Sequence, residues 1–578
     1  MLNWLFRRRR AEPPRDVADE PAIAAWKRGD LAGAETAFRK ALEARPRSAG
    51  ATSNLGMVVL EQGRFDEALS WLRKAVDIDP RHAGAQNNLG IGLARGNLPA
   101  DAARHFRAAL AADPGLVDAR LNLWKPLLDV CDWTTLESEL RDFMALAQTA
   151  PEDEWVTRIS PFVSLLLPIP REMQRRIARA YSVGIERAAA ALSRPSPAVG
   201  GNPQRLRVGY VSGDFYNHAT AHLTAGLFAR HDRSRFEVYA YSIGPGDSSE
   251  YRRRIVEGCD RFVEVGDEPF EATARRIAAD GVHIALDVKG YCGGGRPEIF
   301  ALRPAPIQAS FLGYPGSMGA SFIDYLIADR VVAPESDAQW FSERLVWMPT
   351  SYQVNDRDQP IADRTPARAE VGLPEKGFVF CCFNRNYKID AQIFAVWMRI
   401  LTAVPDSVLW LFRSNLSAKN ALREAALRHG VAHERLVFAT KVPKPAHLAR
   451  HKLADLFLDT HFVNAHTTAS DSLWAGVPLL TWPGETFASR VAASLLHAIG
   501  LPELVASGAK DYEEKAIALA RDPQRLQVLR ERLAQNRLTA PLFDTDRYVR
   551  ELERAYERMW AIYAEQGRPG SFLVADDV

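Results

Sequence analysis

The sequence has few of the features that mark several large classes of protein. Only five of its 578 residues are cysteines. Their number is odd and their spacing matches no metal-binding motif, so we expect a reduced, cytoplasmic protein without a disulfide framework. No apolar run reaches the roughly 18 residues that a membrane helix needs. The positions of the cysteines are Cys131, Cys259, Cys292, Cys381 and Cys382.

The chain also lacks an excess of charge of either sign. The net charge is +2, which gives no electrostatic basis for binding nucleic acid or a membrane surface. Four arginines at 7–10 cluster in what we expect to be a solvated N-terminal tail, and the apolar stretch before them is too short for a signal peptide. With 47% hydrophobic and 25% charged residues, the chain has the composition of a soluble globular protein of two to four domains.

The first quarter of the chain repeats itself. Pro46, Pro80 and Pro114 lie 34 residues apart, and Asn54-Leu55-Gly56 recurs as Asn88-Leu89-Gly90. The same period places small residues at positions where paired helices would cross. It is typical of tetratricopeptide repeats, which form an α-solenoid. Further residues in this register are Ala34, Ala68 and Ala102, then Phe38, Leu72 and Phe106, then Ala41, Ala75 and Ala109.

A solenoid of this kind has a concave face that binds extended peptides or partner proteins. We favour such binding here. The alternative is that the repeats only stiffen or dimerise the protein, since three or four are near the minimum for a stable stack.

After a Pro-, Gly- and Ser-rich linker at 193–204 the pattern changes to short apolar runs that alternate with helical stretches. This alternation predicts an α/β domain with a mainly parallel sheet, and a second such domain begins near Gly377. Two doubly wound domains bind ligands at the carboxyl ends of their strands, in the cleft between them.

The stretch 464–496 carries the clearest ligand signal. It follows the apolar run LADLFLDT, which we interpret as a buried strand. Within the stretch, His466, Thr467 and Thr468 start a predicted helix that has Asp471 in its first turn. Free backbone N–H groups and the positive helix end would point at one spot, which is how proteins bind phosphate groups.

Other candidate residues lie where strands of the second α/β domain end. Lys388, in FNRNYKID, is suited to neutralise a departing diphosphate, and Arg385 would assist. Lys444 could reach a ribose or phosphate and His447 could stack on a base. On spacing alone, a role as an ordinary surface residue explains each of the two equally well.

The first α/β domain offers histidines. His218 lies in a polar turn after a strand and could orient a substrate or move a proton. His283 lies within the apolar run GVHIALDV, where a satisfied core histidine is the simpler interpretation, and Asp280 just before it is equally explained as a turn residue. The glycine-rich run 289–296 would let backbone approach a ligand, but it has no nucleotide-motif spacing.

Together these segments resemble the tetratricopeptide-containing O-linked N-acetylglucosamine transferases, which form glycosyltransferase family 41 with the plant SPINDLY proteins; bacterial members look most similar. The resemblance is most specific in FNRNYKID, NAHTTASDSLWAGVP, PGETFASRVAAS and LRPAPIQASFLGYPGSMGA. It implies a GT-B fold of two Rossmann-like domains behind the α-solenoid, with the donor between the lobes, inversion at the anomeric carbon, and no metal or other cofactor. The absence of an evident Asp-x-Asp cluster at a strand end agrees with metal independence.

The resemblance also implies roles for the candidates. Lys388 and the backbone at 466–468 would hold the diphosphate, Asp471 the ribose, and Lys444 and His447 the uridine. His218 matches the family histidine beside the sugar and acceptor, and Asp280 and His283 match other candidates for the base. The loop Gly313, Tyr314 and Pro315 would line the sugar pocket.

Departures from the family pattern leave the donor less certain than the fold. Arg385 stands where animal members have glutamine, and NAHTTASD replaces NGHTTGMD. We predict a protein O-glycosyltransferase that moves N-acetylglucosamine from UDP-GlcNAc to serine or threonine of an acceptor protein held by the repeats and the cleft. The alternatives are a related transferase that uses GDP-fucose or UDP-glucose, an inactive tetratricopeptide adaptor that still binds nucleotide, and a transferase acting on carbohydrate or a small molecule.

The predicted organisation has six parts. They are an N-terminal tail 1–12; repeats 13–46, 47–80, 81–114 and a degenerate 115–148; a helical bridge and linker 149–204; an amino-terminal lobe 205–370; a carboxyl-terminal lobe 371–565; and a C-terminal tail 566–578.

Overall fold

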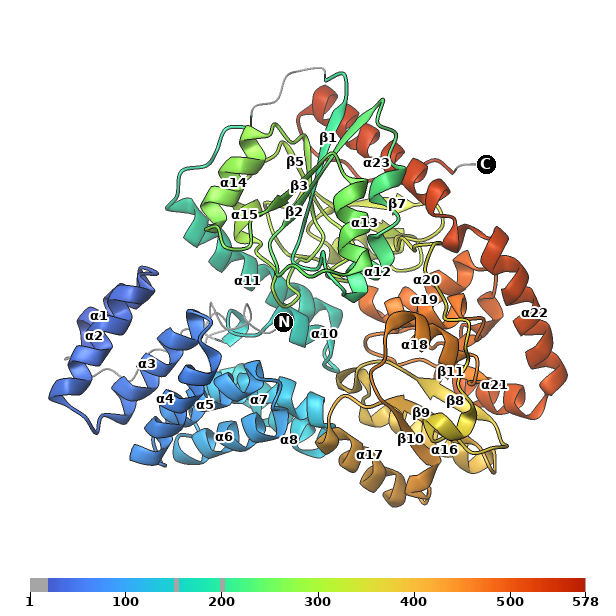
Figure 1. Ribbon diagram of the computed structural model, residues 1–578, viewed down its shortest axis with the longest axis horizontal. Helices are drawn as coiled ribbons and strands as arrows, with labels where there is room; N and C mark the ends of the chain where they lie inside the picture. Colours follow the sequence, from blue (N-terminus) through green and yellow to red (C-terminus); the bar gives the residue numbers. More distant parts are fainter. Residues whose placement is uncertain (1–18, 150–154, 198–202, 577–578) are drawn as a thin grey trace. The chain divides into compact units, whose positions relative to one another are not determined.

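The computed structural model describes residues 19–149, 155–197 and 203–576 (Figure 1). The chain divides into two compact units, Met1–Ile159 and Ser160–Val578, each with its own core. The predicted tail at 1–12, the start of the first repeat and part of the linker lie outside the described residues.

The first unit consists of antiparallel helix pairs, as the 34-residue period predicts. Each repeat contributes two helices joined by a short turn, and neighbouring helices pack along the array. The helices are α1 (Glu20–Lys27), α2 (Leu31–Ala44), α3 (Ala49–Glu61), α4 (Phe65–Ile78), α5 (Ala83–Arg95), α6 (Pro99–Ala112), α7 (Val117–Val130) and α8 (Trp133–Thr149).

One position in every repeat has left-handed backbone. Gly29, Gly63, Asn97 and Cys131 lie 34 residues apart, and their φ angles are +84°, +82°, +57° and +58°. Each follows the first helix of its pair and turns the chain into the second, a position that glycine occupies at least cost. The fourth repeat, whose sequence has drifted most, therefore keeps the same turn with a cysteine.

Small residues let the paired helices approach closely. A Cβ at Gly56 would lie 2.8 Å from Leu72 Cγ, and one at Gly90 would lie 2.6 Å from Phe106 Cε1, so neither position accepts a side chain without a shift. The Leu72 and Phe106 side chains that fill this space are fully buried. The Asn-Leu-Gly motif thus specifies the contact between helices of one repeat.

The second unit begins with α10 (Pro161–Leu165) and α11 (Arg171–Ala190), followed by the amino-terminal lobe. Its sheet has eight strands in the order β13-β7-β6-β5-β4-β1-β2-β3, and neighbouring strands pair in parallel. The strands are β1 (Leu206–Ser212), β2 (Phe236–Ser242), β3 (Arg261–Glu264), β4 (Ile284–Asp287), β5 (Ile307–Ser310), β6 (Tyr325–Asp329), β7 (Arg344–Met348) and β13 (Phe572–Leu573). The helices between them are α12 (Ala219–Thr224), α13 (Glu250–Gly258), α14 (Phe270–Ala279) and α15 (Glu298–Ala301).

The carboxyl-terminal lobe has a five-stranded sheet in the order β10-β9-β8-β11-β12, again parallel. Its strands are nearly all buried apolar residues, which is typical of a parallel sheet covered on both faces. The strands are β8 (Val379–Cys382), β9 (Val408–Phe412), β10 (Leu436–Ala439), β11 (Leu456–Leu458) and β12 (Leu479–Leu480). Its helices are α16 (Ala391–Ala403), α17 (Leu416–Arg428), α18 (Lys444–His451), α19 (Thr467–Trp474), α20 (Val491–Ala498), α21 (Ala509–Arg521) and α22 (Pro523–Thr539). The last helix of the chain is α23 (Thr545–Gln566).

The end of the chain differs from the prediction. Helix α23, expected in the second lobe, packs on β5 and β7 of the first, where Figure 1 shows it in red beside the green elements. Residues 572–573, expected in a tail, form β13 and pair with β7. Tyr556 on α23 explains the return: it is fully buried and its hydroxyl lies 2.9 Å from that of Tyr210 on β1.

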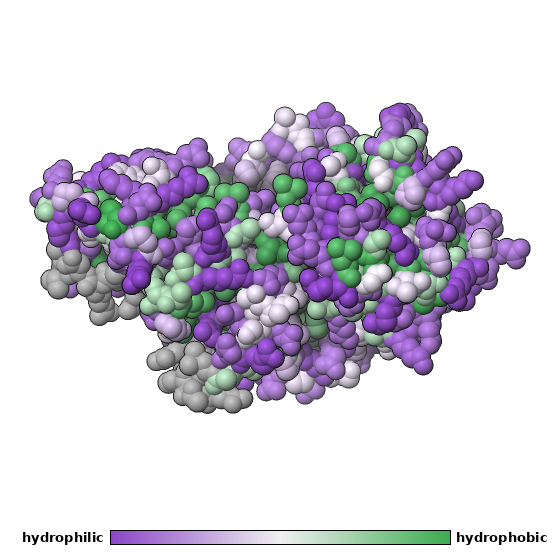
Figure 2. Space-filling view, turned by 90° about the horizontal axis from the view of Figure 1, so that it is seen from below, coloured by the Kyte–Doolittle hydropathy of each residue, from purple (hydrophilic) through white to green (hydrophobic). Residues whose placement is uncertain are grey.

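The surface in Figure 2 is mostly hydrophilic, with apolar residues in scattered spots. The large apolar side chains that are exposed include Leu416 on α17 and Val528 and Leu538 on α22. Among the described residues, no helix combines the length and the hydropathy needed to cross a bilayer.

Candidate functional site

The amino end of α19 presents unpaired backbone donors. The first residues bonded within this helix are Ala469 and Ser470, whose N–H groups donate to His466 O at 3.0 and 3.1 Å. Within the described part of the chain, the N–H groups of His466, Thr467 and Thr468 donate to no other group. The predicted strand-to-helix turn is present, and three amides together with the positive helix end meet at one place.

Lys388 lies beside this helix end. It follows β8, and its Nζ donates to the carbonyl of Asn464 at 2.7 Å, two residues before His466. Burial lowers the pKa of Lys388 to about 8, and the nearby carboxylate of Asp459 opposes that shift. The ammonium is therefore still predominantly charged at pH 7, next to the free amides.

Asp459, directly after β11, is a buried carboxylate that fixes the loop between β11 and α19. Its carboxylate accepts from the backbone N–H of Ala465 at 2.6 Å and from Thr481 Oγ1 at 2.7 Å. Burial raises the pKa of Asp459 to about 7, although these bonds and Lys388 act against the rise. Asp459 was not among the predicted site residues; the signal that could have indicated it is an acid at the end of the apolar run LADLFLDT.

Two further contacts hold α19 in place, one from the loop after β8 and one from α18. Thr468 Oγ1 donates to Asn384 Oδ1 in the loop after β8. Lys444, at the start of α18, forms an ion pair with Asp471 on α19, and both side chains are less than 10% exposed. Burial raises the pKa of Asp471, whereas Lys444 lowers it. The predicted ribose and uridine residues therefore lie in direct contact.

His447, one turn along α18, sits in an aromatic cluster. Its ring centroid is 5.1 Å from that of Phe383 and 4.4 Å from that of His451. Burial lowers the pKa of His447 well below its usual value, so the ring is neutral at pH 7 and accepts a bond from Arg450 Nε at 3.0 Å. A neutral ring of this kind can stack on a base.

Arg385 and His466 complete the second lobe's share of the site. Arg385 is exposed, with its guanidinium 5.7 Å from the ring centroid of Phe412. Burial lowers the pKa of His466 to about 3, and its Nε2 lies 3.2 Å from Ala488 O. His466 is thus neutral, and its contribution to an anion is its backbone N–H.

The first lobe brings His218 to the same region. His218 is the residue before α12, and α12 packs against α19 of the second lobe. Burial lowers the pKa of His218 to about 4; Asp214 raises it, while Lys289 and then Arg385 of the second lobe lower it. A neutral imidazole therefore faces the cationic end of the other lobe.

The loop 313–315 lies against the glycine-rich loop that follows β4. Cys292 Sγ is 3.1 Å from Gly313 O, and a Cβ at Gly313 would lie 2.3 Å from Val288 O, so the close approach requires glycine. Tyr314 is buried, with its hydroxyl 3.4 Å from Pro161 O on the far side. The glycine-rich run thus supports the loop predicted to line the sugar pocket.

Two residues predicted to be catalytic, Asp280 and His283, do not lie with the other site residues at the carboxyl ends of the strands, so the structure contradicts their assignment. Asp280 ends α14 and accepts from Tyr241 and Arg261, while His283 precedes β4 and accepts the backbone N–H of Arg207 at 2.9 Å. Both lie at the amino edge of the sheet. His283 is separated from Asp287, at the carboxyl end of β4, by about 13 Å at about 3.3 Å per residue. Burial lowers the pKa of His283 to about 4, as befits a core histidine.

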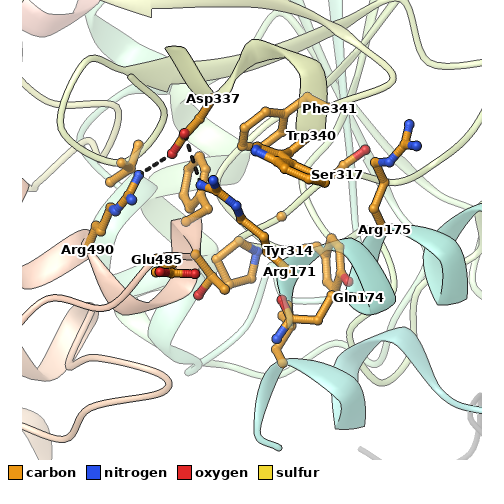
Figure 3. Close-up of a pocket in the computed structure, with 16 residues that line it drawn as sticks. Arg171, Gln174, Arg175, Tyr314, Ser317, Asp337, Trp340, Phe341, Glu485 and Arg490 are labelled. Carbon is orange, nitrogen blue, oxygen red and sulfur yellow. Dashed lines mark hydrogen bonds and ion pairs between the residues drawn. The ribbon is translucent and has the colours of Figure 1, made fainter. Parts of the chain in front are cut away.

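A separate pocket lies beside the predicted site, and Figure 3 shows its lining. Of the predicted site residues only Tyr314 and Pro315 line it. Asp337 stands between two guanidinium groups, Arg171 on α11 at 2.9 Å and Arg490 before α20 at 2.7 Å. This triad ties the second lobe to the first through partly buried ion pairs.

Family models cover most of the chain. The glycosyl transferase family 41 model matches residues 130–365 and 361–552. The chain belongs to glycosyl transferase family 41. A tetratricopeptide repeat model also matches residues 22–83, within the helical repeats.

Two curated relatives align with most of the chain. A probable UDP-N-acetylglucosamine–peptide N-acetylglucosaminyltransferase of Arabidopsis thaliana is 38% identical over 462 residues, which is 78% of this chain and 47% of the relative. A UDP-N-acetylglucosamine–peptide N-acetylglucosaminyltransferase of Caenorhabditis elegans is 30% identical over 559 residues, covering 76% and 48%. The family 41 chain thus spans about half the length of these relatives.

A solved structure matches nearly end to end. A mutant O-GlcNAc transferase of Thermobaculum terrenum aligns with a TM-score of 0.69 and 28% identity, over 95% of this chain and 98% of that one. The predicted fold class is confirmed: tetratricopeptide repeats precede two Rossmann-like domains, consistent with GT-B.

Proposed function

We propose that this chain is an inverting protein O-glycosyltransferase that transfers N-acetylglucosamine from UDP-GlcNAc to serine or threonine. The observation that carries the proposal is the ammonium of Lys388, 2.7 Å from Asn464 O at the open end of α19. A cation and three free amides at one point suit a diphosphate, and the relatives are named for transfer from UDP-N-acetylglucosamine to a peptide.

The reaction needs a base for the acceptor hydroxyl and stabilisation of the charge on the departing diphosphate. The acceptor oxygen attacks C1 of the sugar and passes its proton to a base, for which His218 is our candidate, while the bond from C1 to the diphosphate oxygen breaks and UDP departs with the bonding electrons. Charge grows on the leaving diphosphate, so Lys388 and the amides at 466–468 stabilise the transition state more than the ground state. These groups would do the work that a metal ion does in other transferases. Among the described residues, no group of three or more His, Cys, Asp or Glu is arranged to hold a metal ion.

The remaining site residues hold the rest of the donor. Asp471 would accept from the ribose hydroxyls with Lys444 keeping it charged, and His447 would stack on the uracil. His218 would face the sugar and the acceptor from the other lobe, with Gly313, Tyr314 and Pro315 along the sugar. In this arrangement the second lobe binds the nucleotide and the first lobe meets the sugar.

A donor panel tests the sugar assignment. The full chain is incubated with a lysate and radiolabelled UDP-GlcNAc, GDP-fucose or UDP-glucose, and protein-bound label is counted after release from serine and threonine. We expect transfer from UDP-GlcNAc alone. Label from one of the other donors instead would contradict the sugar, and UDP binding by calorimetry without any transfer would point to an inactive adaptor.

A further inference from the structure

A buried ion pair at the carboxyl edge of the first sheet has no part in the chemistry above. Asp214 follows β1 and Lys289 follows β4, two strands paired in register from Val208 with Ile284 to Val211 with Asp287. Lys289 Nζ lies 2.5 and 2.6 Å from the two carboxylate oxygens of Asp214. Each side chain is only 4% exposed. Because the pair is buried, separating the two side chains would leave an unpaired charge out of water, so both groups are held in one geometry.

The carboxylate of Asp214 also faces His218. Its Oδ2 accepts from Thr220 Oγ1 at 3.1 Å and lies 3.3 Å from His218 Nδ1. The backbone N–H of Thr220 points at the same Nδ1 from 3.3 Å. A carboxylate only accepts, so its contact needs a proton on Nδ1, whereas the Thr220 contact needs a lone pair there. The two contacts therefore select opposite tautomers of His218.

We propose that Lys289 is a positioning residue for His218, acting through Asp214 to set the tautomer and limit the basicity of the imidazole. The inference deepens the proposed function, because it concerns the histidine placed beside the acceptor. An ammonium bound to both oxygens withdraws negative charge from the carboxylate, so Asp214 orients the ring without making it strongly basic. The tautomer with Nδ1 protonated leaves the Nε2 lone pair free for a substrate hydroxyl.

The charged groups around His218 fix the sign of the effect. Asp214 faces it from the loop after β1, Lys289 from the loop after β4, and Arg385 from the second lobe. The phenol ring of Tyr216 is 5.5 Å away, and His222 on α12 is uncharged, since burial lowers its pKa to about 2. Removing Lys289 takes away a cation and leaves Asp214 facing the ring, so the pKa of His218 rises.

The test follows histidine by nitrogen-15 NMR in the full chain, with Lys289→Met as the variant and Lys376→Met, an exposed lysine, as the matched control. Signals of His218 are assigned by their loss in His218→Asn. We expect wild-type His218 to be neutral near pH 6 with its proton on Nδ1. In Lys289→Met the pKa should rise by about one unit or more, as loss of a neighbouring charge produces. Lys289→Arg should restore the wild-type value, and Lys376→Met should leave it unchanged.

A folded Lys289→Met protein whose His218 keeps the wild-type pKa and tautomer would overturn the inference. If that variant fails to fold, the double variant Asp214→Asn/Lys289→Met decides, because it buries no lone charge. There His218 should accept from the Thr220 N–H and carry its proton on Nε2; persistence of the Nδ1 proton would also overturn the inference.

Turnover gives an independent readout. The acid limb of kcat/KM should move to higher pH in Lys289→Met and return in Lys289→Arg. A wild-type protein that transfers no sugar would defeat the proposed function, yet the NMR titration would still decide the role of Lys289.

Discussion

At the residue scale the site depends on one cation placed where backbone donors are already free. Lys388 is held by Asn464 O and by the field of Asp459, not by a carboxylate of its own. A fully paired lysine would have less charge to offer a departing diphosphate. Burial lowers the pKa of Lys388, and the field of Asp459 offsets only part of that shift.

Replacing Lys388 by alanine should lower kcat by about 100-fold or more, which is typical for loss of one group that stabilises transition-state charge. Initial rates with UDP-GlcNAc measure it, and Lys376→Ala, an exposed lysine before β8, is the matched control. Near-normal kcat in the Lys388 variant would remove this residue from its role.

The same residue predicts a pH dependence. Burial lowers the pKa of Lys388 to about 8, and its protonated form is the active one, so kcat/KM should fall as pH rises through about 8. In Lys388→Arg the basic limb should move to higher pH, because guanidinium keeps its proton. A profile that stays flat well above pH 8 in the wild type would contradict the assignment.

The candidate residues of the second lobe could be predicted because they come in short runs after apolar strands. Asp280 and His283 were predicted at the wrong end of a strand, because an apolar strand pattern does not show which end faces the ligand. Asp459 and the Asp214–Lys289 pair were missed for a related reason: each depends on contacts between segments about 75 residues apart or spread over several loops. No local pattern encodes such contacts.

At the scale of elements, the helical repeats and most strands could be predicted because periodicity reports them directly. Strands β3 and β7 were not predicted, and β3 is a short, partly exposed strand at the edge of the sheet. Strand β13 has only two residues and exists because α23 returns to the first lobe. That return is set by packing of Tyr556 and its neighbours, which a pattern of single elements does not contain.

The repeat turn gives a stability prediction. Gly63 has φ of +82° and a Cβ there would meet nothing within 4 Å, so Gly63→Ala should cost about 1 kcal/mol from backbone strain alone. Gly184, exposed within α11, is the matched control, and alanine there should stabilise by about 0.5–1 kcal/mol. Urea unfolding followed by circular dichroism measures both; shifts of the same sign would contradict this account of the turn.

At the scale of the whole molecule, two units divide the work. The site residues all belong to Ser160–Val578, whereas the repeats belong to Met1–Ile159. Because each unit has its own core, donor binding should not need the repeats.

A fragment of residues 160–578 should therefore bind UDP within about twofold of the full chain. It should lose at least tenfold in transfer to protein acceptors if the solenoid binds them on its concave face, as we propose. Calorimetry and labelling of a lysate check the two halves of this prediction. Equal labelling by fragment and full chain would show that the repeats do not recognise the acceptor.

The central claim is that Lys388 and the open end of α19 drive sugar transfer from UDP-GlcNAc to protein hydroxyl groups. The most direct measurement is mass spectrometry of acceptor proteins after reaction with UDP-GlcNAc, using the full chain and the Lys388→Ala variant side by side. We predict N-acetylhexosamine on serine or threonine with the full chain and its near-complete loss with the variant. Modification that is equally abundant with both proteins, or none with either, would contradict the account.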